Sequence, residues 1–368
     1  MKQSSAPNRY PFSIPVGWFA VAETPDLAVG QVRAAYYFDT HLVLWRDETG
    51  EPHVSDAFCP HLGAHLGHGG TVEGCEIRCP FHGWAFDAEG ANTEIPYSER
   101  TNGRARIRTY PVLERNEFIY AWYHPGGEQP TWEITEVTEI GGGELSGPKR
   151  TSHVVRAGIQ EMAENGVDTA HFRYVHNTAT VPVMERYETD GHRAVMESSQ
   201  KFPTPRGVVD GRIDSIADGP GVSIVRFSGI IDTLLVSAST PVDADTTETR
   251  FNYYVRSMGD EKLNSSVGEA FAAEVDKQFL EDMPIWEHKA HLVRPALADN
   301  DGPFMKFRKW YAQFYVDQPS DVAGDERTVF PPPYWPDKLS ETPAKATASA
   351  RYGDPEPSVV SPAPPAPV

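Results

Sequence analysis

Alternating hydrophobic and polar positions fill the first third of the chain. From residue 16 to about residue 125, runs of β-forming residues alternate with turn signals such as Glu48-Thr49-Gly50. The run EFIYAWYHP closes this stretch as one more strand. The pattern predicts a β-rich N-terminal domain over residues 15–125.

The pattern changes after a Gly/Pro-rich bridge at about residues 124–148. Residues 158–176 predict a helix, and residues 192–256 have the density of β-branched residues that is typical of a buried sheet. A second helix is expected over about residues 268–292. These elements predict a second domain over residues 126–335, and the whole chain is expected to have an α+β fold.

The end of the chain has a different composition. The last 33 residues, from Pro336, contain eight prolines, many alanines and almost no large apolar residues. Such a segment cannot bury enough apolar surface to offset the loss of chain entropy on folding. Residues 336–368 are therefore expected to form a disordered tail.

Composition and charge narrow the class of protein. A chain of 368 residues is long enough for two domains, and its net charge of −19 argues against nucleic acid or anionic membranes as partners. Three cysteines make no disulfide framework, which favours a reducing compartment. The N-terminal stretch has no apolar signal segment, and no run approaches the roughly 20 apolar residues of a membrane span. We expect a cytoplasmic protein without a membrane span.

Two short Gly/Pro-rich stretches contain a candidate metal site. AFCPHLGAHLGHGG and CPFHGW present Cys59, His61, Cys79 and His82 in the pattern C-x-H followed by C-x-x-H. Zinc accepts two cysteines and two histidines, so a structural zinc site is one interpretation. A Rieske 2Fe–2S cluster uses the same residues differently, with two thiolates on one iron and two imidazoles on the other. The surrounding sheet-forming region favours the cluster.

Three further residues near this motif could also bind metal. His65 and His68 share the first loop and are interpreted as loop or hydrogen-bonding histidines. Cys75 lies between the two loops and is interpreted as an ordinary thiol.

A second set of polar residues lies in ENGVDTAHFRYVHN, residues 164–177. On a helix, Asn165, Asp168 and His171 follow one another around one face, and His176 returns to the same side. An exposed polar face is the ordinary interpretation of such spacing. The apolar residues between them leave little solvated surface, which favours a metal site built on His171 and His176.

The second predicted helix offers a carboxylate ligand. Its apolar stripe consists of Phe271, Val275, Phe279 and Trp286. Asp282 continues this stripe, and an aspartate facing a core is costly unless it is paired or binds a metal. Pro284 is expected to kink the helix next to it. Glu287 and His288 are the alternatives, whereas Glu281 falls off the stripe.

With both motifs in view, residues 15–335 resemble the oxygenase component of a Rieske non-heme iron oxygenase. Stretches such as GVVDGRID, DMPIWEHK and DGPFMKFRKWYAQFYVD are similar to bacterial 3-ketosteroid 9α-hydroxylase oxygenases. The sterol 7-desaturases of animals are similar in the same places. The fold that this resemblance implies is a β-rich Rieske domain beside a catalytic domain, in which an antiparallel sheet curves around a long helix.

The resemblance also implies the cofactors. Cys59, His61, Cys79 and His82 would hold the 2Fe–2S cluster. His171, His176 and Asp282 would hold a mononuclear Fe(II) as a 2-His-1-carboxylate triad, with O₂ as the co-substrate.

Electron supply and partners follow from the same resemblance. Asp168 would bridge His82 of one subunit and His171 of its neighbour within a homotrimer, and Asn165 would share the catalytic site. The chain has no convincing nicotinamide or flavin motif, because IGGGELSG has the wrong spacing and no helix is expected after it. A separate NADH-dependent flavin and iron–sulfur reductase, acting directly or through a ferredoxin, is therefore implied.

The expected activity is hydroxylation of a hydrophobic, steroid-like molecule. Three alternatives stay open at this stage: sterol desaturation, demethylation or hydroxylation of a small aromatic compound, and electron transfer by a Rieske protein without oxygenase activity. A binding module stabilised by zinc is a fourth interpretation, and a colourless protein would support it.

Overall fold

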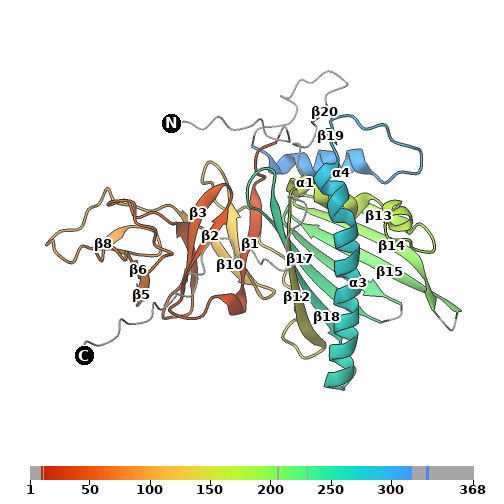
Figure 1. Ribbon diagram of the computed structural model, residues 1–368, viewed down its shortest axis with the longest axis horizontal. Helices are drawn as coiled ribbons and strands as arrows, with labels where there is room; N and C mark the ends of the chain where they lie inside the picture. Colours follow the sequence, from red (N-terminus) through yellow and green to blue (C-terminus); the bar gives the residue numbers. More distant parts are fainter. Residues whose placement is uncertain (1–9, 11, 205–206, 230, 317–328, 331–368) are drawn as a thin grey trace, which may run out of the picture.

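Antiparallel sheets make up most of the regular secondary structure in the computed structural model (Figure 1). The structure describes residues 10, 12–204, 207–229, 231–316 and 329–330. The tail predicted over residues 336–368 lies outside the described residues. The α+β class, with a β-rich N-terminal part and an antiparallel sheet beside a long helix, is confirmed.

The N-terminal part contains two sheets that enclose one core. The first has the order β1-β11-β10 and the second the order β2-β3-β4-β9. Their bounds are β1 Gly17–Glu23, β2 Val32–Tyr37, β3 Thr40–Arg46, β4 Pro52–Asp56, β9 Thr109–Tyr110, β10 Val112–Arg115 and β11 Phe118–Tyr123. A short 3-10 helix, Thr24–Asp26, follows β1. The strand predicted at EFIYAWYHP is β11, and it pairs with β1.

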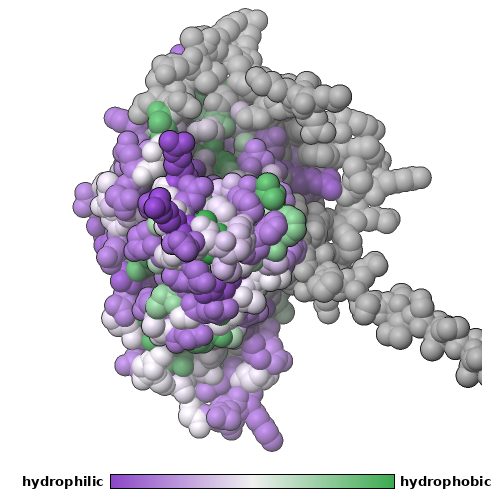
Figure 2. All heavy atoms as spheres, turned by 90° about the vertical axis from the view of Figure 1, so that its left-hand side faces the viewer, coloured by the Kyte–Doolittle hydropathy of each residue, from purple (hydrophilic) through white to green (hydrophobic). Residues whose placement is uncertain are grey.

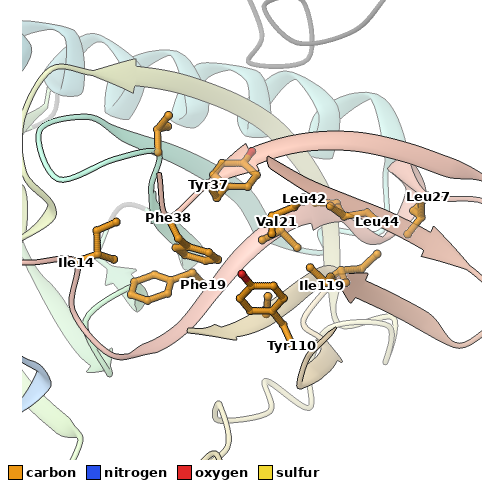
Figure 3. Packing of buried hydrophobic residues seen from close by; sticks show 14 of the residues in the cluster. Ile14, Phe19, Val21, Leu27, Tyr37, Phe38, Leu42, Leu44, Tyr110 and Ile119 are labelled. Atoms are coloured by element: carbon orange, nitrogen blue, oxygen red, sulfur yellow. The ribbon is translucent and has the colours of Figure 1, made fainter. Parts of the chain in front are cut away.

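Side chains from both of these sheets meet in the core shown in Figure 3. Phe19, Val21, Leu42, Leu44 and Ile119 are at most 3% exposed. The same cluster includes Ile159 and Val242, which come from the predicted second domain. The N-terminal sheets are therefore packed against the C-terminal part rather than joined to it by a linker alone. The predicted domain boundary at residue 125 stays a prediction.

A small third sheet holds the cysteine and histidine loops. It has the order β5-β6-β7-β8, with bounds β5 Thr71–Glu73, β6 Glu76–Arg78, β7 Ala85–Phe86 and β8 Asn92–Glu94. One loop precedes β5 and the other joins β6 to β7. In Figure 1 this sheet lies at the end of the molecule opposite the long helix.

A seven-stranded antiparallel sheet forms the C-terminal part. Its order is β12-β18-β17-β16-β15-β14-β13, so each strand from β13 to β18 pairs with the next one along the chain. The bounds are β12 Leu145–Val155, β13 Val183–Asp190, β14 Arg193–Thr204, β15 Gly207–Asp218, β16 Val222–Ser228, β17 Thr233–Pro241 and β18 Thr247–Arg256. The sheet predicted over residues 192–256 is confirmed. β12 begins inside the segment that the sequence indicated as a bridge.

The 28-residue helix α3, Glu261–His288, packs against β12 and β18. It begins earlier than predicted because Asp260 caps it: the carboxylate accepts hydrogen bonds from the backbone N–H groups of Lys262 and Leu263. Phe279, Asp282 and Trp286 are buried, as the stripe predicted. The helix continues through Pro284 to His288 without a break, so the expected kink does not interrupt it.

The prediction of one continuous helix over residues 158–176 is wrong, although most of the segment is helical. The segment consists of α1 Ile159–Ala163, a 3-10 turn Glu164–Val167 and α2 His171–Tyr174. Between them Asp168 is extended, and its carboxylate accepts hydrogen bonds from the backbone N–H groups of Ala170 and His171. An aspartate that bonds to the following backbone competes with a continuous helix. The predicted arrangement on one helical face is therefore also wrong.

The remaining elements close one end of the C-terminal part. They are β19 His291–Leu292, α4 Phe304–Tyr311, a 3-10 turn Ala312–Phe314 and β20 Val329–Phe330. Phe307, Trp310 and Tyr311 of α4 are buried against Val167.

Candidate metal centres

The two cysteine-containing loops have the same backbone geometry. In the first, the N–H of Gly63 donates to the carbonyl of Cys59 at 2.9 Å. In the second, the N–H of Gly83 donates to the carbonyl of Cys79 at 3.0 Å. Gly63 and Gly83 have φ angles of +76° and +70°, which glycine adopts without strain. The repeated Cys-Pro start and glycine at the fifth position thus build two matching loops.

The four predicted cluster ligands come together at these loops. The rings of His61 and His82 are 4.8 Å apart, and Cys59 and Cys79 are both buried, with thiols close enough to interact. The buried Nδ1 atom of His82 has no hydrogen-bond partner within the described part of the chain. Burial raises the pKa of the Cys59 thiol to about 11, so a thiolate there needs a cation beside it. Both observations fit a bound iron–sulfur cluster.

The other candidates in this region lie in or between the same loops, and the buried Nε2 of His65 has no hydrogen-bond partner among the described residues. Nδ1 of His65 accepts a hydrogen bond from the backbone N–H of Gly67, and its ring lies 4.5 Å from that of His68. Cys75 is exposed. These contacts agree with the loop interpretation of the two histidines.

The second centre brings together residues that lie far apart in the chain. One ligand atom each from His171, His176 and Asp282 lies within 4.8 Å of the other two. His171 comes from α2, His176 from the turn after it and Asp282 from α3. Nε2 of His176 is 3.4 Å from Oδ2 of Asp282, and the two histidine rings are 5.1 Å apart. Two imidazoles and one carboxylate that bind one face of a metal ion are the ligand set of non-heme Fe(II) oxygenases.

Asn165 and Trp286 hold the Asp282 carboxylate. The Asn165 amide donates to Oδ2 of Asp282 at 3.0 Å, and the Trp286 indole N–H donates to Oδ1 of Asn165 at 3.2 Å. Because an indole only donates, it fixes which end of the Asn165 amide faces Asp282. Burial raises the pKa of the Asp282 carboxyl, and the attraction of His171 and His176 offsets only part of this effect.

The Asp168 carboxylate is close to His171 but does not hydrogen-bond to its ring within one chain. Nδ1 of His171 is 2.6 Å from the backbone oxygen of Asp168, whereas the nearest Asp168 carboxylate oxygen is 3.9 Å from Nδ1. The carboxylate caps the start of α2 instead. Burial lowers the pKa of His171, but Asp168 and Asp282 outweigh burial and the pKa is raised. The predicted bridge to His82 of a neighbouring subunit stays a prediction.

The alternative ligands on α3 point elsewhere. Glu287 accepts a hydrogen bond from the backbone N–H of Arg156, and Nδ1 of His288 lies 2.8 Å from the carbonyl of Pro284. Neither belongs to the group of three potential ligands.

A cavity of about 320 Å³ opens onto the second centre. It lies between the sheet, α3 and α4, and His171, His176 and Asp282 form part of its wall. Most of its lining is apolar, including Val222, Val225, Phe227, Phe251, Val275, Phe279, Phe307 and Trp310. Its volume is in the range of pockets that enclose one small organic molecule.

Sequence reasoning missed three residues that shape this centre. Trp286 was assigned only to the apolar stripe, and Glu281, set aside because it falls off that stripe, lies 3.0 Å from Nδ1 of His176. Gly302 allows the closest approach: a Cβ atom there would lie 1.6 Å from the backbone oxygen of Val167. No pattern in the sequence marks this glycine, because its partner is more than a hundred residues away.

Comparison with known proteins identifies the family. A family model described as the 3-ketosteroid 9alpha-hydroxylase C-terminal domain matches residues 121–315, and one described as the Rieske [2Fe-2S] domain matches residues 17–111. The chain is 34% identical to the cholesterol 7-desaturase of Caenorhabditis elegans, over 84% of this chain and 79% of that protein. It is 31% identical to a 3-ketosteroid-9-alpha-monooxygenase oxygenase component of Rhodococcus rhodochrous, over 87% of this chain and 88% of that protein.

Solved structures agree on the fold. Dicamba monooxygenase bound to dicamba superposes with a TM-score of 0.63 at 18% identity, over 81% of this chain and 96% of that one. The chain therefore belongs to the Rieske oxygenases, in the family that contains 3-ketosteroid 9α-hydroxylase oxygenase components and cholesterol 7-desaturases. The resemblance seen in the motifs is confirmed. The cofactors are a Rieske 2Fe–2S cluster and a mononuclear non-heme iron, and O₂ is the co-substrate.

The assignments of individual residues as metal ligands stay predictions, which the geometry above supports.

Among the helices of the described residues, none combines the length and the apolar character that crossing a bilayer requires.

Proposed function

We propose that this chain is the terminal oxygenase of a multicomponent monooxygenase that hydroxylates a steroid-like, 3-ketosteroid substrate. The observation that supports this proposal best is the largely apolar cavity of about 320 Å³ that ends at His171, His176 and Asp282. A rigid apolar molecule buried there would present one C–H bond to the metal centre. The similarity to a 3-ketosteroid-9-alpha-monooxygenase oxygenase component supports the same substrate class.

Polar groups on the cavity floor suit a substrate with an oxygen function. Ser223 of β16 and Ser237 of β17 are directly opposite each other in the sheet and line the cavity. Nearby, the hydroxyls of Ser239 and Thr249 bond to each other at 2.9 Å. A few placed hydroxyls in an apolar pocket orient a ligand and discriminate among ligands. A keto or hydroxyl oxygen of the substrate could bond to Ser223 and Ser237.

The reaction consumes one O₂, two electrons and two protons, forms a C–O bond from a C–H bond and releases water. Cys59, Cys79, His61 and His82 would hold the cluster, and His171, His176 and Asp282 would hold the iron. When bound, these groups supply single-electron transfer and O₂ reduction, respectively. Because the sequence has no convincing dinucleotide motif, a separate NADH-dependent reductase would provide the electrons, directly or through a ferredoxin.

We further propose a homotrimer. The sheet β5–β8 lies far from α3 along the long axis of the molecule (Figure 1), so a cluster from a neighbouring subunit would reach the iron more directly. Figure 2 looks onto this end and shows a mainly hydrophilic face with small separate hydrophobic groups. Leu62, Phe81 and Tyr97, close to the cluster loops, are 60–65% exposed. No disulfide joins the three described cysteines, which suits a reducing compartment such as the cytoplasm.

A second activity, sterol desaturation, has one observation in its favour. The chain is at least as similar to the cholesterol 7-desaturase of Caenorhabditis elegans as to the bacterial monooxygenase component. Desaturation would use the same iron and cavity but would remove two hydrogens from the substrate and transfer no oxygen to it.

The test is turnover of a panel of steroids and small aromatics with a reductase, NADH and ¹⁸O₂, with products identified by mass spectrometry. One ¹⁸O atom in a steroid product would support the proposal. Loss of two hydrogens without ¹⁸O would support desaturation, and turnover of the small aromatics alone would overturn the steroid assignment.

A further inference from the structure

Glu281 of α3 contacts the outer edge of the His176 ring. Oε2 of Glu281 lies 3.0 Å from Nδ1 of His176, whose side chain is only 2% exposed. On the other edge of the same ring, Nε2 lies 3.4 Å from Oδ2 of Asp282. One imidazole is therefore held between two consecutive carboxylates of one helix.

These contacts determine where the ring proton is. An ionised carboxylate only accepts hydrogen bonds, so the Glu281 contact places the proton on Nδ1. Nε2 then presents a lone pair toward the oxygen of Asp282. Two lone-pair donors at this separation are favourable neighbours only when a proton or a metal ion lies between them. The arrangement thus prepares His176 to bind iron through Nε2.

We propose that Glu281 is a positioning residue for the mononuclear iron: it fixes the tautomer and orientation of His176. Its role has no side-chain equivalent at His171, whose Nδ1 bonds to the backbone oxygen of Asp168 at 2.6 Å. Both histidines keep Nε2 available for the metal, but only His176 depends on a carboxylate. Such partners of a metal-bound imidazole orient the ring and increase its basicity.

The remaining surroundings of Glu281 allow this role to be tested. Its side chain is 32% exposed, and Oε1 lies 3.8 Å from Nζ of Lys277, so a neutral substitution there leaves no fully buried charge. Glu274, on the same helix, also lies 3.8 Å from Nζ of Lys277, but its hydrogen bond is to the amide of Gln278 and not to His176, which makes it a matched control.

The experiment measures Fe(II) affinity by chelator competition on protein with an intact cluster, together with the electron paramagnetic resonance signal of the nitric oxide complex. Glu281→Ala should weaken Fe(II) binding about 10- to 100-fold. Glu281→Gln should restore most of the affinity, because its amide oxygen accepts the same hydrogen bond, and Glu274→Ala should match wild type. Cluster absorbance should be unchanged in all three variants.

This inference rests on the proposed iron site, so Asp282→Ala is measured alongside. Wild-type affinity and an unchanged signal in Glu281→Ala, with iron lost in Asp282→Ala, would overturn the role of Glu281 alone. Unchanged affinity in both variants would overturn the site itself. If Glu281→Ala does not fold, weakened iron binding in Glu281→Leu with rescue by Glu281→Gln supports the role, and equal affinities in these two variants overturn it.

Discussion

In the Rieske region, the four predicted ligands lie between residues 59 and 82, whereas the predicted iron ligands are residues 171, 176 and 282. The first site is braced by its own loops, because each glycine N–H bonds back to its own cysteine. The second is assembled by tertiary contact between a segment of short helical turns and one turn of α3. A site assembled by tertiary contact depends on every element that holds its ligands in place.

The largest expected effect is complete loss of one metal without loss of the other. Cys59→Ala should abolish the visible absorbance of the cluster. Asp282→Ala should leave the absorbance intact, empty the mononuclear site and abolish turnover, because a triad without its carboxylate no longer compensates the charge of Fe(II). Metal analysis and absorbance spectra check both. Full iron and activity in Asp282→Ala would contradict the assigned ligand.

The same contrast explains how far the sequence could predict the molecule. The cluster ligands could be recognised because loop geometry follows from a local motif of cysteine, proline and glycine. His171, His176 and Asp282 could be chosen by residue type and by the burial of Asp282. Their local geometry could not, because the break at Asp168 arises from a side-chain cap that competes with helical periodicity. The approach of Gly302 to Val167 depends on tertiary structure alone.

The next effect concerns Asp168, which structure and family resemblance assign to different roles. Asn caps a helix about as well as Asp, so Asp168→Asn should keep the α2 cap and change the free energy of unfolding by less than about 1 kcal/mol. It would lose the charge needed to bridge His82 of a neighbour and His171. Turnover should fall about 100-fold, with cluster and iron retained.

Rapid-mixing kinetics test that prediction directly. A pre-reduced Asp168→Asn variant, given substrate and O₂, should reoxidise its cluster far more slowly than wild type. Normal reoxidation with normal product formation would leave Asp168 with the capping role only. Asp168→Ala, which loses both the cap and the charge, is the comparison that separates stability from electron transfer.

A smaller effect is expected at Glu161, which lies in the helix before the segment that carries His171 and His176. Glu161 of α1 is 1% exposed and bonds to Nδ1 of His291 at 2.5 Å and to Nζ of Lys289 at 2.8 Å. Burial would raise the pKa of Glu161, but His291 and Lys289 outweigh it and lower the pKa to about 2. Breaking a buried ion pair is costly, so Glu161→Gln should destabilise the protein by about 3 kcal/mol at pH 7.

The pH dependence of that effect has a definite sign. Because the folded pKa of Glu161 is below its ordinary value of 4.5, the ionised form is favoured by folding. Its contribution is present above about pH 4.5 and is lost as the pH falls toward 2. The stability difference between wild type and Glu161→Gln, measured by thermal unfolding, should therefore be constant from pH 7 to about 5 and shrink below that. A difference that grows in acid would contradict this account.

The smallest expected effect concerns substrate recognition, which involves the cavity beside the mononuclear site and not the cluster loops. Ser237 lines the cavity opposite Ser223, whereas the cluster loops are not part of the cavity lining. Removing one hydroxyl that bonds to a substrate oxygen costs about 1 kcal/mol, so Ser237→Ala should lower kcat/KM about fivefold for an oxygenated steroid. The same variant should leave kcat/KM unchanged for the analogue without that oxygen, and iron and cluster should stay at wild-type levels. Ser228→Ala, on β16 but outside the cavity lining, is the control. An equal loss for both steroids would mean that Ser237 acts through packing, and no loss for either would place recognition of the oxygen elsewhere in the cavity.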